Sequence, residues 1–386
     1  MPADGRKRAI IIGAGPGGLA AAIALRQVGI AVQVFEAAQE LRPIGAGLTL
    51  WTNAVKATDQ LGLTAAIQAR AGGEVGGEIR SWRGPVLARI PATMLARTFG
   101  AANIAIHRAE LQAAMLDVLD VGIVETGARC LSFAQDADEV RVQLADGREV
   151  RGDLLIGADG IHSVVREQLF GISSLRYAGY TAWRGVTHVP DAAFPPGRGF
   201  LTLGPGGHMG FVHIGPSQVY WFAALNAAAG GQDAPRGGRH AVLAHFGGWH
   251  GPIRAIVAAT AEAAILRTDL YDRPPILRWT AGRVTLLGDA AHPMTPNLGQ
   301  GACQALEDAV VLARCLQARD DIPAALGRYE TARIPRTTAV VNTSWRAGKL
   351  LQVDNPGLCR VRDAVMRRLP QRLVLQQLAP IVGYEV

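Results

Sequence analysis

The feature that most constrains the fold is a glycine-rich turn close to the start of the chain. Gly13, Gly15 and Gly18 are spaced in the pattern G-x-G-x-x-G. The continuous apolar run 9–12 stands before them, and such a run is typical of a parallel strand buried on both faces. Residues 19–28 then predict a helix. A strand, a tight turn and a helix in this order predict an α/β unit at the start of the fold.

The same turn also predicts a kind of ligand. Glycines let the backbone approach a pyrophosphate closely, and the free N–H groups of the helix start favour its negative charge. Glu36 stands 23 residues after Gly13, at the end of a second apolar strand over 31–35. A carboxylate there can accept hydrogen bonds from the ribose of an adenosine. The glycines alone would also fit a purely structural turn, but together with Glu36 they indicate dinucleotide binding.

Composition excludes several classes of protein. The chain has 386 residues, 49% of them hydrophobic, which is ample for a buried core and suggests two to three domain-sized units. The 46 glycines show no three-residue period, so the chain is not collagen-like. The cysteines form no CxxC pair, which argues against a disulfide scaffold and a thiolate zinc site and suits a reducing cytoplasm. They are Cys130, Cys303, Cys315 and Cys359.

The charge pattern favours an anionic small molecule over nucleic acid. The net charge is +7, and the only lysines are Lys7, Lys56 and Lys349, so arginine carries nearly all of the positive charge. The arginines are mostly dispersed, whereas nucleic-acid binders concentrate charge in runs or stripes. No stretch reaches the roughly 18 apolar residues of a membrane helix, and the short run 9–12 leads into a turn rather than a cleavage site. We therefore expect a cytoplasmic protein without integral membrane contact.

The rest of the chain alternates between two patterns. Residues 175–275 are rich in aromatic residues, alternation and Gly/Pro breaks, which predicts an antiparallel sheet. It is inserted between segments of the α/β type. Those segments are predicted as a helix at 108–119, a hairpin at 140–144 and 149–151, strands at 153–156 and 284–287, and a helix at 300–316. The domains expected are a Rossmann-like part at 1–174 with a substrate segment at about 70–105, the sheet domain at 175–275, the last α/β part at 276–330, and a helical segment at 331–386.

Two further turns carry acidic residues after apolar strands. Asp159 follows the first, and it reads most simply as a turn former, with Arg166 as a solvated charge on the next helix. Asp289 follows the second, and it could bond the ribityl hydroxyls of a flavin. The helix that starts after Gly299 could then face an anion. His292 lacks a second metal ligand at a suitable spacing, so we interpret it as an orienting histidine and expect no metal site.

These three motifs, in this order and spacing, resemble the single-component FAD-dependent aromatic hydroxylases with the p-hydroxybenzoate hydroxylase fold. The resemblance covers nearly the whole chain and is greatest to the branch of urate, 6-hydroxynicotinate, salicylate and 3-hydroxybenzoate hydroxylases. Supporting motifs are Gly45-Ala46-Gly47-Leu48 with Asn53-Ala54, Ile106-His107-Arg108-Ala109-Glu110-Leu111, and Gly179-Tyr180 with Trp183-Arg184-Gly185.

The resemblance implies which residues bind the cofactor. Gly13, Gly15 and Gly18 would hold the FAD pyrophosphate and Glu36 the adenosine ribose, while Arg108 lies in the helix whose arginine contacts FAD. Further residues implied are Asp159, in a turn that serves both FAD and NAD(P)H, Asp289 at the ribityl chain, Arg42 and Gly47, and Pro296, Gly299, Gln300, Gly301 and Ala302 beside the isoalloxazine ring. No second nucleotide-binding unit follows, which fits the family's transient binding of NADH or NADPH.

The reaction implied is a monooxygenation. NAD(P)H would reduce the flavin, O2 would add to it as a 4a-hydroperoxide, and one oxygen would pass to a small aromatic or N-heteroaromatic ring. Three alternatives stay open. One is a tailoring enzyme for a larger, polycyclic natural product, including an epoxidase or an antibiotic-modifying enzyme. Another is a flavin-dependent reductase, and the third is a non-enzymatic FAD-binding protein. The protein could be a monomer or a homodimer.

The substrate site is expected between the flavin and the inserted sheet. The catalytic candidates are His208, Tyr220 and Arg184, and the substrate-contacting candidates are Thr49, Met209, His213, Phe222 and Asn297. Alternation puts His208 on one face of its strand and Met209 and His213 on the other. The chain departs from known types, because the urate type has an arginine at His208 and the 6-hydroxynicotinate type a histidine at Thr49. Packing in the core remains the alternative for each of these residues.

The last sixty residues include a basic amphipathic stretch over 360–377. Val361, Val365, Leu369 and Leu373 recur at helical spacing among arginines. Such a stripe fits a helix that lies on a membrane surface. It fits a helix packed against the flavin-binding part better, because buried helices carry the same stripe.

Overall fold

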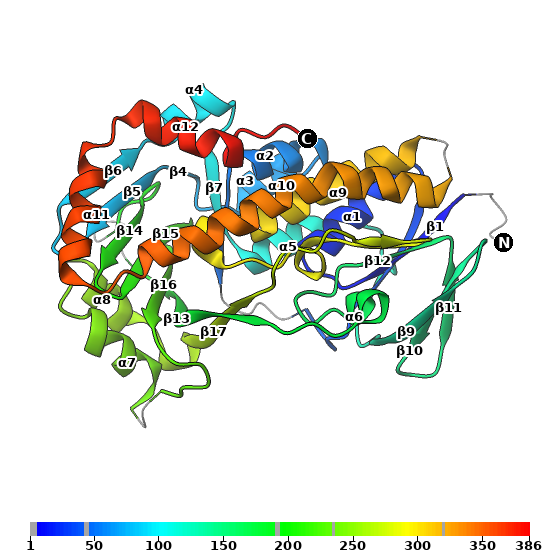
Figure 1. Ribbon diagram of the computed structural model, residues 1–386, viewed down its shortest axis with the longest axis horizontal. Helices are drawn as coiled ribbons and strands as arrows, with labels where there is room; N and C mark the ends of the chain where they lie inside the picture. Colours follow the sequence, from blue (N-terminus) through cyan, green and yellow to red (C-terminus); the bar gives the residue numbers. More distant parts are fainter. Residues whose placement is uncertain (1–5, 42–45, 190–193, 234–235, 319–320) are drawn as a thin grey trace.

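The computed structural model describes residues 6–41, 46–189, 194–233, 236–318 and 321–386. The molecule is elongated, with an α/β part at one end and a large sheet at the other (Figure 1). The long helix α10 runs across both parts (Figure 1). The fold is therefore the mixed α/β architecture that the sequence predicts, with an inserted sheet and a helical C-terminus.

A six-stranded sheet forms the centre of the α/β part, in the order β18-β19-β12-β1-β2-β8. Its strands are β1 (Arg8–Ile12), β2 (Ala31–Phe35), β8 (Val124–Glu125), β12 (Leu154–Gly157), β18 (Thr280–Ala281) and β19 (Val284–Leu286). All neighbours pair in parallel except β18 and β19. Burial explains the composition of β1, since Ala9, Ile10 and Ile11 are fully buried between helical layers.

The helices of this part pack around the sheet. They are α1 (Pro16–Gln27), α2 (Thr52–Gln60), α3 (Thr64–Arg70), α5 (Arg108–Leu116), α6 (Val164–Phe170) and α9 (Gly301–Gln317). Helix α1 packs against α9 and α5. It begins with Pro16 at its first position, where the missing N–H costs nothing. Its Ala-rich middle is fully buried, because small side chains let α1 and α9 approach closely.

A seven-stranded sheet forms the second part, in the order β17-β13-β16-β15-β14-β5-β6. Its strands are β5 (Gly77–Ser81), β6 (Val86–Ile90), β13 (Arg176–His188), β14 (Gly199–Gly204), β15 (Gly207–Gly215), β16 (Gln218–Asn226) and β17 (Leu266–Asp272). The pairs are antiparallel except β14 with β5. The segment near residues 70–105 thus adds two edge strands, and Pro205 and Gly206 form a turn between β14 and β15.

One face of this sheet is covered by α7 (Gly237–Phe246) and α8 (Ile253–Ala259). The core beneath them contains Trp221, Phe246 and Met209, all almost fully buried. The opposite face carries Tyr220 and Phe222, and it packs against the small sheet β3-β7-β4. The strands of that sheet are β3 (Gly47–Leu50), β4 (Glu74–Val75) and β7 (Asn103–His107). The two parts of the molecule therefore meet at this second face.

The remaining elements are short or peripheral. Strands β9 (Cys130–Gln135), β10 (Val140–Leu144) and β11 (Glu149–Gly152) form a three-stranded antiparallel sheet, which confirms the predicted hairpin. Helix α4 (Ala92–Phe99) follows β6, and three 3-10 turns complete the fold as η1 (Glu262–Ala264), η2 (Gly288–Ala290) and η3 (Pro296–Leu298). No helix of the described residues has both the length and the apolar character needed to cross a membrane.

The C-terminal helices differ from expectation in two respects. Helix α10 (Ile322–Leu351) runs without a break through the domain boundary that we placed at residue 331. Helices α11 (Pro356–Arg368) and α12 (Gln371–Val382) follow it. The stripe expected to pack inward faces outward, since Val361 is 60% and Val365 54% exposed. Helix α11 instead turns Cys359 and Arg362 toward β6 and the large sheet.

Candidate active site

The predicted cofactor motifs meet at one edge of the six-stranded sheet. The glycine-rich turn follows β1, Glu36 follows β2, Asp159 follows β12 and Asp289 follows β19. These four strands are parallel neighbours, so their carboxyl ends lie at the same edge. Ligands of open α/β sheets bind at this edge. The topology therefore brings together motifs as far apart in the sequence as Gly13 and Asp289.

The three glycines of the turn have different local roles. Gly13 has φ +104°, and a Cβ there would overlap the carbonyl of Ala158. A Cβ on Gly18 would overlap the carbonyl oxygen of Gly13. A Cβ on Gly15 would meet nothing within 4 Å. Gly13 and Gly18 are thus required for close packing of the turn, whereas Gly15 keeps open space in front of the start of α1.

Glu36 and the turn are linked by hydrogen bonds. One carboxylate oxygen of Glu36 accepts from the Ala14 N–H at 2.8 Å, and the other accepts from the Ala38 N–H at 2.9 Å. The side chain of Gln112, on α5, donates to the Ala14 carbonyl at 2.9 Å. Arg108 begins the same helix and is exposed. These contacts fix the carboxylate of Glu36 beside the open space at Gly15.

The two oxygens of Asp159 are in different surroundings. Oδ2 accepts from the N–H groups of Val164 at 2.8 Å and Val165 at 3.3 Å, at the start of α6. Oδ1 is buried and has no hydrogen-bond partner among the described residues. Burial raises the pKa of Asp159 above its ordinary value, against the effect of its hydrogen bonds. Asp159 is therefore a turn former through one oxygen, and the other remains available to a ligand.

Arg166 corrects a sequence interpretation. We expected a solvated helix charge, but this side chain is 5% exposed. Its guanidinium donates to the carbonyls of Ala290 at 3.1 Å and Ala291 at 3.3 Å. Burial and the nearby charge of Arg273 lower the pKa of Arg166 to about 10. Arg166 thus ties the turn after β12 to the turn after β19, which carries Asp289.

Asp289 is the exposed residue of the turn after β19. Its side chain is exposed although Gly288 and Ala290 on either side are buried. The surrounding protein raises its pKa, and the neighbouring His292 and Arg108 act in the opposite direction. A Cβ on Gly301 would lie 3.7 Å from its carboxylate. Asp289 therefore faces the start of α9, whose first N–H groups are available to an anion.

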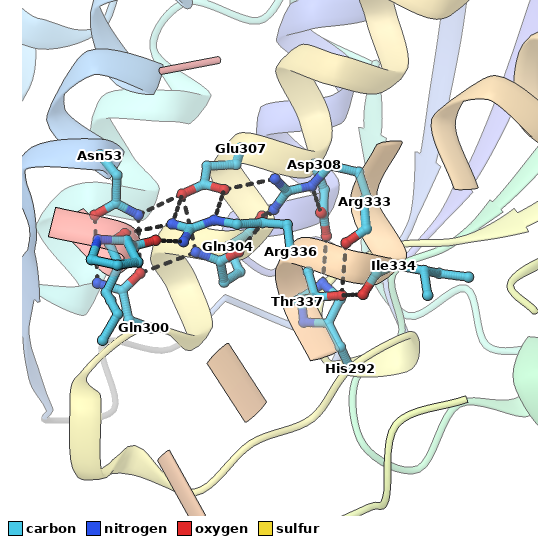
Figure 2. Close-up of polar contacts among 12 residues, drawn as sticks. Asn53, His292, Gln300, Gln304, Glu307, Asp308, Arg333, Ile334, Arg336 and Thr337 are labelled. Carbon is cyan, nitrogen blue, oxygen red and sulfur yellow. Dashed lines mark hydrogen bonds and ion pairs between the residues drawn. The ribbon is translucent and has the colours of Figure 1, made fainter. Parts of the chain in front are cut away.

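A buried polar network fixes the start of α9 from behind (Figure 2). Asn53 donates to Gln300 at 2.9 Å and to Glu307 at 2.6 Å. Arg333 and Arg336, both from α10, pair with Glu307 at 2.7 Å and 3.0 Å. Gln300 is fully buried, so its role in the structure is to hold the loop to α2. The sequence motifs did not reveal this network, since its members come from three helices far apart in the chain.

The network continues to His292, whose Nε2–H donates to the ionised Asp308 at Oδ2, at 2.6 Å (Figure 2). Arg333 Nε donates to Asp308 Oδ1 at 2.7 Å. Burial alone would raise the pKa of Asp308, but His292 and Arg333 together lower it to about 2. No cluster of three potential metal ligands occurs in the described part of the chain. His292 is held by Asp308, as an orienting residue would be.

Tyr220 and Phe222 stand on the face of the large sheet that meets the α/β part. A Cβ on Gly47 of β3 would lie 2.5 Å from the Tyr220 side chain, so Gly47 is in close contact with that residue. Gly210 leaves space for the Phe222 ring. The rings of Tyr220 and Phe222 lie 6.2 Å apart. These aromatic residues therefore border the cofactor motifs directly.

His208 and Arg184 share this face. The His208 ring lies 5.8 Å from that of Phe222, and Arg184 pairs with Phe222 across β13 and β16. Burial and the charge of Arg362 lower the pKa of His208 to about 4. Burial raises the pKa of Tyr220 to about 12. At neutral pH both side chains are therefore uncharged and can exchange hydrogen bonds with a ligand.

Two predicted substrate residues, Met209 and His213, are placed elsewhere, and a third, Asn297, is held by hydrogen bonds within the protein. Met209 is fully buried in the core beneath α7 and α8, and His213 stacks on Phe194 at 5.2 Å, on the same side. The alternation was therefore right, but these residues belong to the far face. The amide of Asn297 is used by hydrogen bonds within the protein, because it donates to the hydroxyls of Tyr180 at 2.8 Å and Thr295 at 2.9 Å.

The other candidates lie along the same interface. Thr49 is half-buried on β3, two residues after Gly47. Pro296 and Gly299 are exposed at the turn before α9, while Gly301 and Ala302 are half-buried in its first turn. Arg42 lies outside the described residues.

Comparison with known proteins identifies the group to which this geometry belongs. Residues 6–344 match the model of a family described as an FAD binding domain. The chain is 45% identical to the aurachin C monooxygenase/isomerase of Stigmatella aurantiaca, over 93% of this chain and 94% of that protein. It is 38% identical to the 3-amino-4-hydroxybenzoate 2-monooxygenase of Streptomyces cremeus, over 93% and 91%.

The chain belongs to the FAD-dependent aromatic hydroxylases. The fold agrees, since the crystal structure of Klebsiella pneumoniae HpxO with FAD and uric acid superposes with a TM-score of 0.92 at 33% identity. That match covers 98% of this chain and 97% of the other. FAD is the cofactor of this family, with NAD(P)H and dioxygen as co-substrates.

The residues present fit FAD. The open space at Gly15 lies before a helix start, which suits a pyrophosphate. The exposed carboxylate of Asp289 lies beside the start of α9, where hydroxyl groups of a ribityl chain could donate to it. The unpartnered Oδ1 of Asp159 is a further free acceptor at the same edge of the sheet.

Proposed function

We propose that this hydroxylase holds FAD along the carboxyl edge of the six-stranded sheet. Gly13, Gly15 and Gly18 would hold the pyrophosphate, Glu36 the adenosine ribose, and Asp289 the ribityl chain. The remaining residues proposed to contact FAD are Gly47, Arg108, Asp159, Pro296, Gly299, Gly301 and Ala302. The convergence of four strand ends on one edge supports this assignment.

We further propose that an aromatic or N-heteroaromatic ring binds between the loop before α9 and the large sheet. The observation that carries this proposal is the contact of Tyr220 with Gly47, which joins the sheet face to the cofactor motifs. Phe222 supplies an apolar surface for a ring, while Arg184 and His208 supply polar contacts on the same face. Thr49 borders the same interface from β3.

When bound, FAD supplies the two-electron chemistry that activates dioxygen. The protein's part is to bind the ring, orient it and exclude water. Tyr220 remains a neutral phenol, so its hydroxyl can donate to a ring oxygen or nitrogen. His208 is neutral too, and a ring nitrogen can accept a hydrogen bond from a substrate hydroxyl. The cation of Arg184 favours the ionised form of such a hydroxyl.

The test is NAD(P)H oxidation by the purified flavoprotein with a panel of rings. Wild type and Tyr220→Phe are compared, with Tyr177→Phe, near the start of β13, as the matched control. We expect one class of ring to stimulate oxidation in the wild type. Tyr220→Phe should lower kcat/KM for that ring by about tenfold, as the loss of one buried hydrogen bond predicts. Equal kinetics of Tyr220→Phe and wild type would exclude Tyr220 from the site.

A second candidate is monooxygenation of a larger substrate. A cavity of about 490 Å³ opens beside Tyr180, Trp345 and Gln352. It is also lined by Thr295, which bonds Asn297 in the loop before α9. Stimulation by extended rings and none by single rings would favour this candidate.

A further inference from the structure

Three buried polar side chains gather where the C-terminal helices meet the large sheet. His208 comes from β15, Gln352 from the end of α10, and Arg362 from α11. They are 3%, 8% and 6% exposed. A guanidinium so far from water is costly unless it is paired and hydrogen-bonded. The hydrogen-bond partners of these three side chains therefore decide whether the cluster is stable as it stands.

The cluster leaves several polar atoms without partners. Among the described residues, no hydrogen bond is made by His208 Nδ1, by either amide atom of Gln352, or by Nη1 and Nη2 of Arg362. Arg362 Nε donates to Asp363 Oδ1 at 3.1 Å, and Nη2 forms an ion pair with the same oxygen at 3.0 Å. Only Nε of the guanidinium thus makes a hydrogen bond, Nη2 is engaged by charge alone, and Nη1 has neither kind of contact. Buried groups of this kind ordinarily have a partner, which here is either water or a ligand.

The backbone holds these groups in place. The Gly206 N–H donates to the Val353 carbonyl at 2.8 Å, and the Asn226 side chain donates to the Gln352 carbonyl at 2.9 Å. The connection between α10 and α11 is therefore fixed to the β14–β15 turn, two residues before His208. Leu203, the strand neighbour of His208, packs in one cluster with Leu351 and Met366. These contacts fix the backbone around Arg362, so the position of its unpaired Nη1 is set by the fold.

The cluster lies on the face proposed for substrate. His208 is in edge contact with Phe222, whose ring neighbours Tyr220. Gln352 also lines the cavity beside Tyr180. The charge of Arg362 acts on His208, and Arg362 is itself paired with Asp363, which is 15% exposed. The free donors therefore point to a ligand group that accepts hydrogen bonds and carries negative charge.

We propose that Arg362, His208 and Gln352 form an anion recess that binds an ionised oxygen of the aromatic substrate, a carboxylate or a phenolate. This rests on the proposed substrate site at Tyr220 and Phe222. The fork of an arginine matches such oxygens, and hydrogen bonds to a charged acceptor are the stronger kind. Gln352 can donate through Nε2, and His208 can donate in the tautomer that carries the proton on Nδ1. The C-terminal helix α11 thereby takes part in selecting the substrate.

The test measures binding to the FAD-loaded enzyme by the change in flavin absorbance, independently of turnover. The probes are 3-amino-4-hydroxybenzoate and its uncharged counterpart 3-amino-4-hydroxybenzamide. Wild type should bind the acid at least about tenfold more tightly, as one charge-assisted hydrogen bond predicts. A nitrophenol, titrated below and above its own pKa, separates a phenolate preference from a carboxylate preference. Equal affinity of wild type for the charged and uncharged forms of both ligands would overturn the proposal.

Variants then assign the preference to the recess. Arg362→Gln should weaken binding of the anion by about tenfold or more and leave that of the amide within about twofold. Arg367→Gln, an exposed arginine of the same helix, is the matched control and should change neither. Arg362→Lys keeps the charge and should retain part of the preference for the acid over the amide. This variant keeps the test valid if Arg362→Gln does not fold. Equal losses for acid and amide in Arg362→Gln would show a purely structural role and refute the recess.

Failure of the recess can be distinguished from failure of the proposed function. Aromatic rings could stimulate NAD(P)H oxidation while Arg362→Gln weakens binding of the acid and the amide equally. The proposed substrate site would then be retained and the anion recess refuted. If no ring changes the flavin spectrum or the oxidation rate of a fully loaded enzyme, the proposed substrate site fails and the recess fails with it.

Discussion

The glycine-rich turn gives a prediction in which two neighbouring glycines behave differently. Gly18→Ala places a Cβ onto the carbonyl oxygen of Gly13, which is backbone and cannot rotate away. Gly13 is itself held at φ +104° against Ala158. Overpacking of this kind costs about 1–3 kcal/mol, and a backbone obstacle puts the expected loss at about 3 kcal/mol. At two to four degrees per kcal/mol, the melting temperature of the apoprotein should fall by roughly 6–12 °C.

Gly15→Ala is the matched control. Gly15 has φ −68° and ψ 174°, which alanine adopts without strain, and its Cβ would meet no protein atom within 4 Å. The apoprotein should therefore keep its stability within about 0.5 kcal/mol. The new methyl group would occupy the space in which a pyrophosphate approaches the backbone, so FAD affinity should fall by at least about tenfold.

The assay combines thermal unfolding of both apoproteins with titration of FAD by fluorescence quenching. The reasoning predicts a stability defect in Gly18→Ala and a binding defect without a stability defect in Gly15→Ala. An apoprotein of Gly15→Ala that melts as low as Gly18→Ala would refute the division of roles. Wild-type FAD affinity in Gly15→Ala would refute the placement of the pyrophosphate.

Three further predictions concern the carboxylates and the buried histidine. Glu36→Ala and Asp289→Ala should each lower the FAD content of the purified protein, and normal flavin content in both would contradict the cofactor assignment. Asp308→Asn leaves Arg333 without one buried partner and should lower the free energy of unfolding by about 3 kcal/mol in urea titrations. Because the pKa of Asp308 is lowered to about 2, its stabilising contribution is present above pH 4 and is lost as the pH falls toward 2, which acid melting curves would reveal. The pKa of His208 is about 6.5 in the unfolded chain and about 4 in the folded chain, so between these values only the unfolded chain binds a proton there. The free energy of unfolding should therefore fall by about 3 kcal/mol as the pH is lowered from 6.5 to 4. His208→Gln should flatten this part of the stability profile.

The sequence allowed the motifs at the carboxyl edge of the six-stranded sheet to be recognised because their determinants are local. Gly13, Glu36 and Asp289 each follow a short apolar strand, and parallel strands bring their ends to one edge. The residues that hold this edge from behind could not be predicted in the same way. Asn53 and Arg333 contribute to it through contacts with α9 that depend on how whole helices pack.

The sidedness of the large sheet was also beyond sequence reasoning. Alternation placed His208 on one face of the strand and Met209 and His213 on the other. The two-residue period does not say which of these faces meets the cofactor. The faces are decided by α7 and α8, which cover Met209.

The outward stripe on α11 has a similar origin. Val361 and Val365 give a persuasive apolar face, yet the helix buries Arg362 and Cys359 instead. The connection fixed at Val353 sets the rotation of the helix. A tertiary restraint therefore overrides the amphipathic pattern.

The measurement that tests the account most directly is aerobic oxidation of NADH and NADPH by the purified flavoprotein in the presence of ¹⁸O2. The panel includes hydroxybenzoates, aminohydroxybenzoates, hydroxypyridines, purines and quinolones. The account predicts that one ring class stimulates oxidation and that its product carries one ¹⁸O atom for each NAD(P)H consumed. A fully FAD-loaded protein that oxidises NAD(P)H with a ring substrate but returns a product without ¹⁸O would contradict monooxygenation.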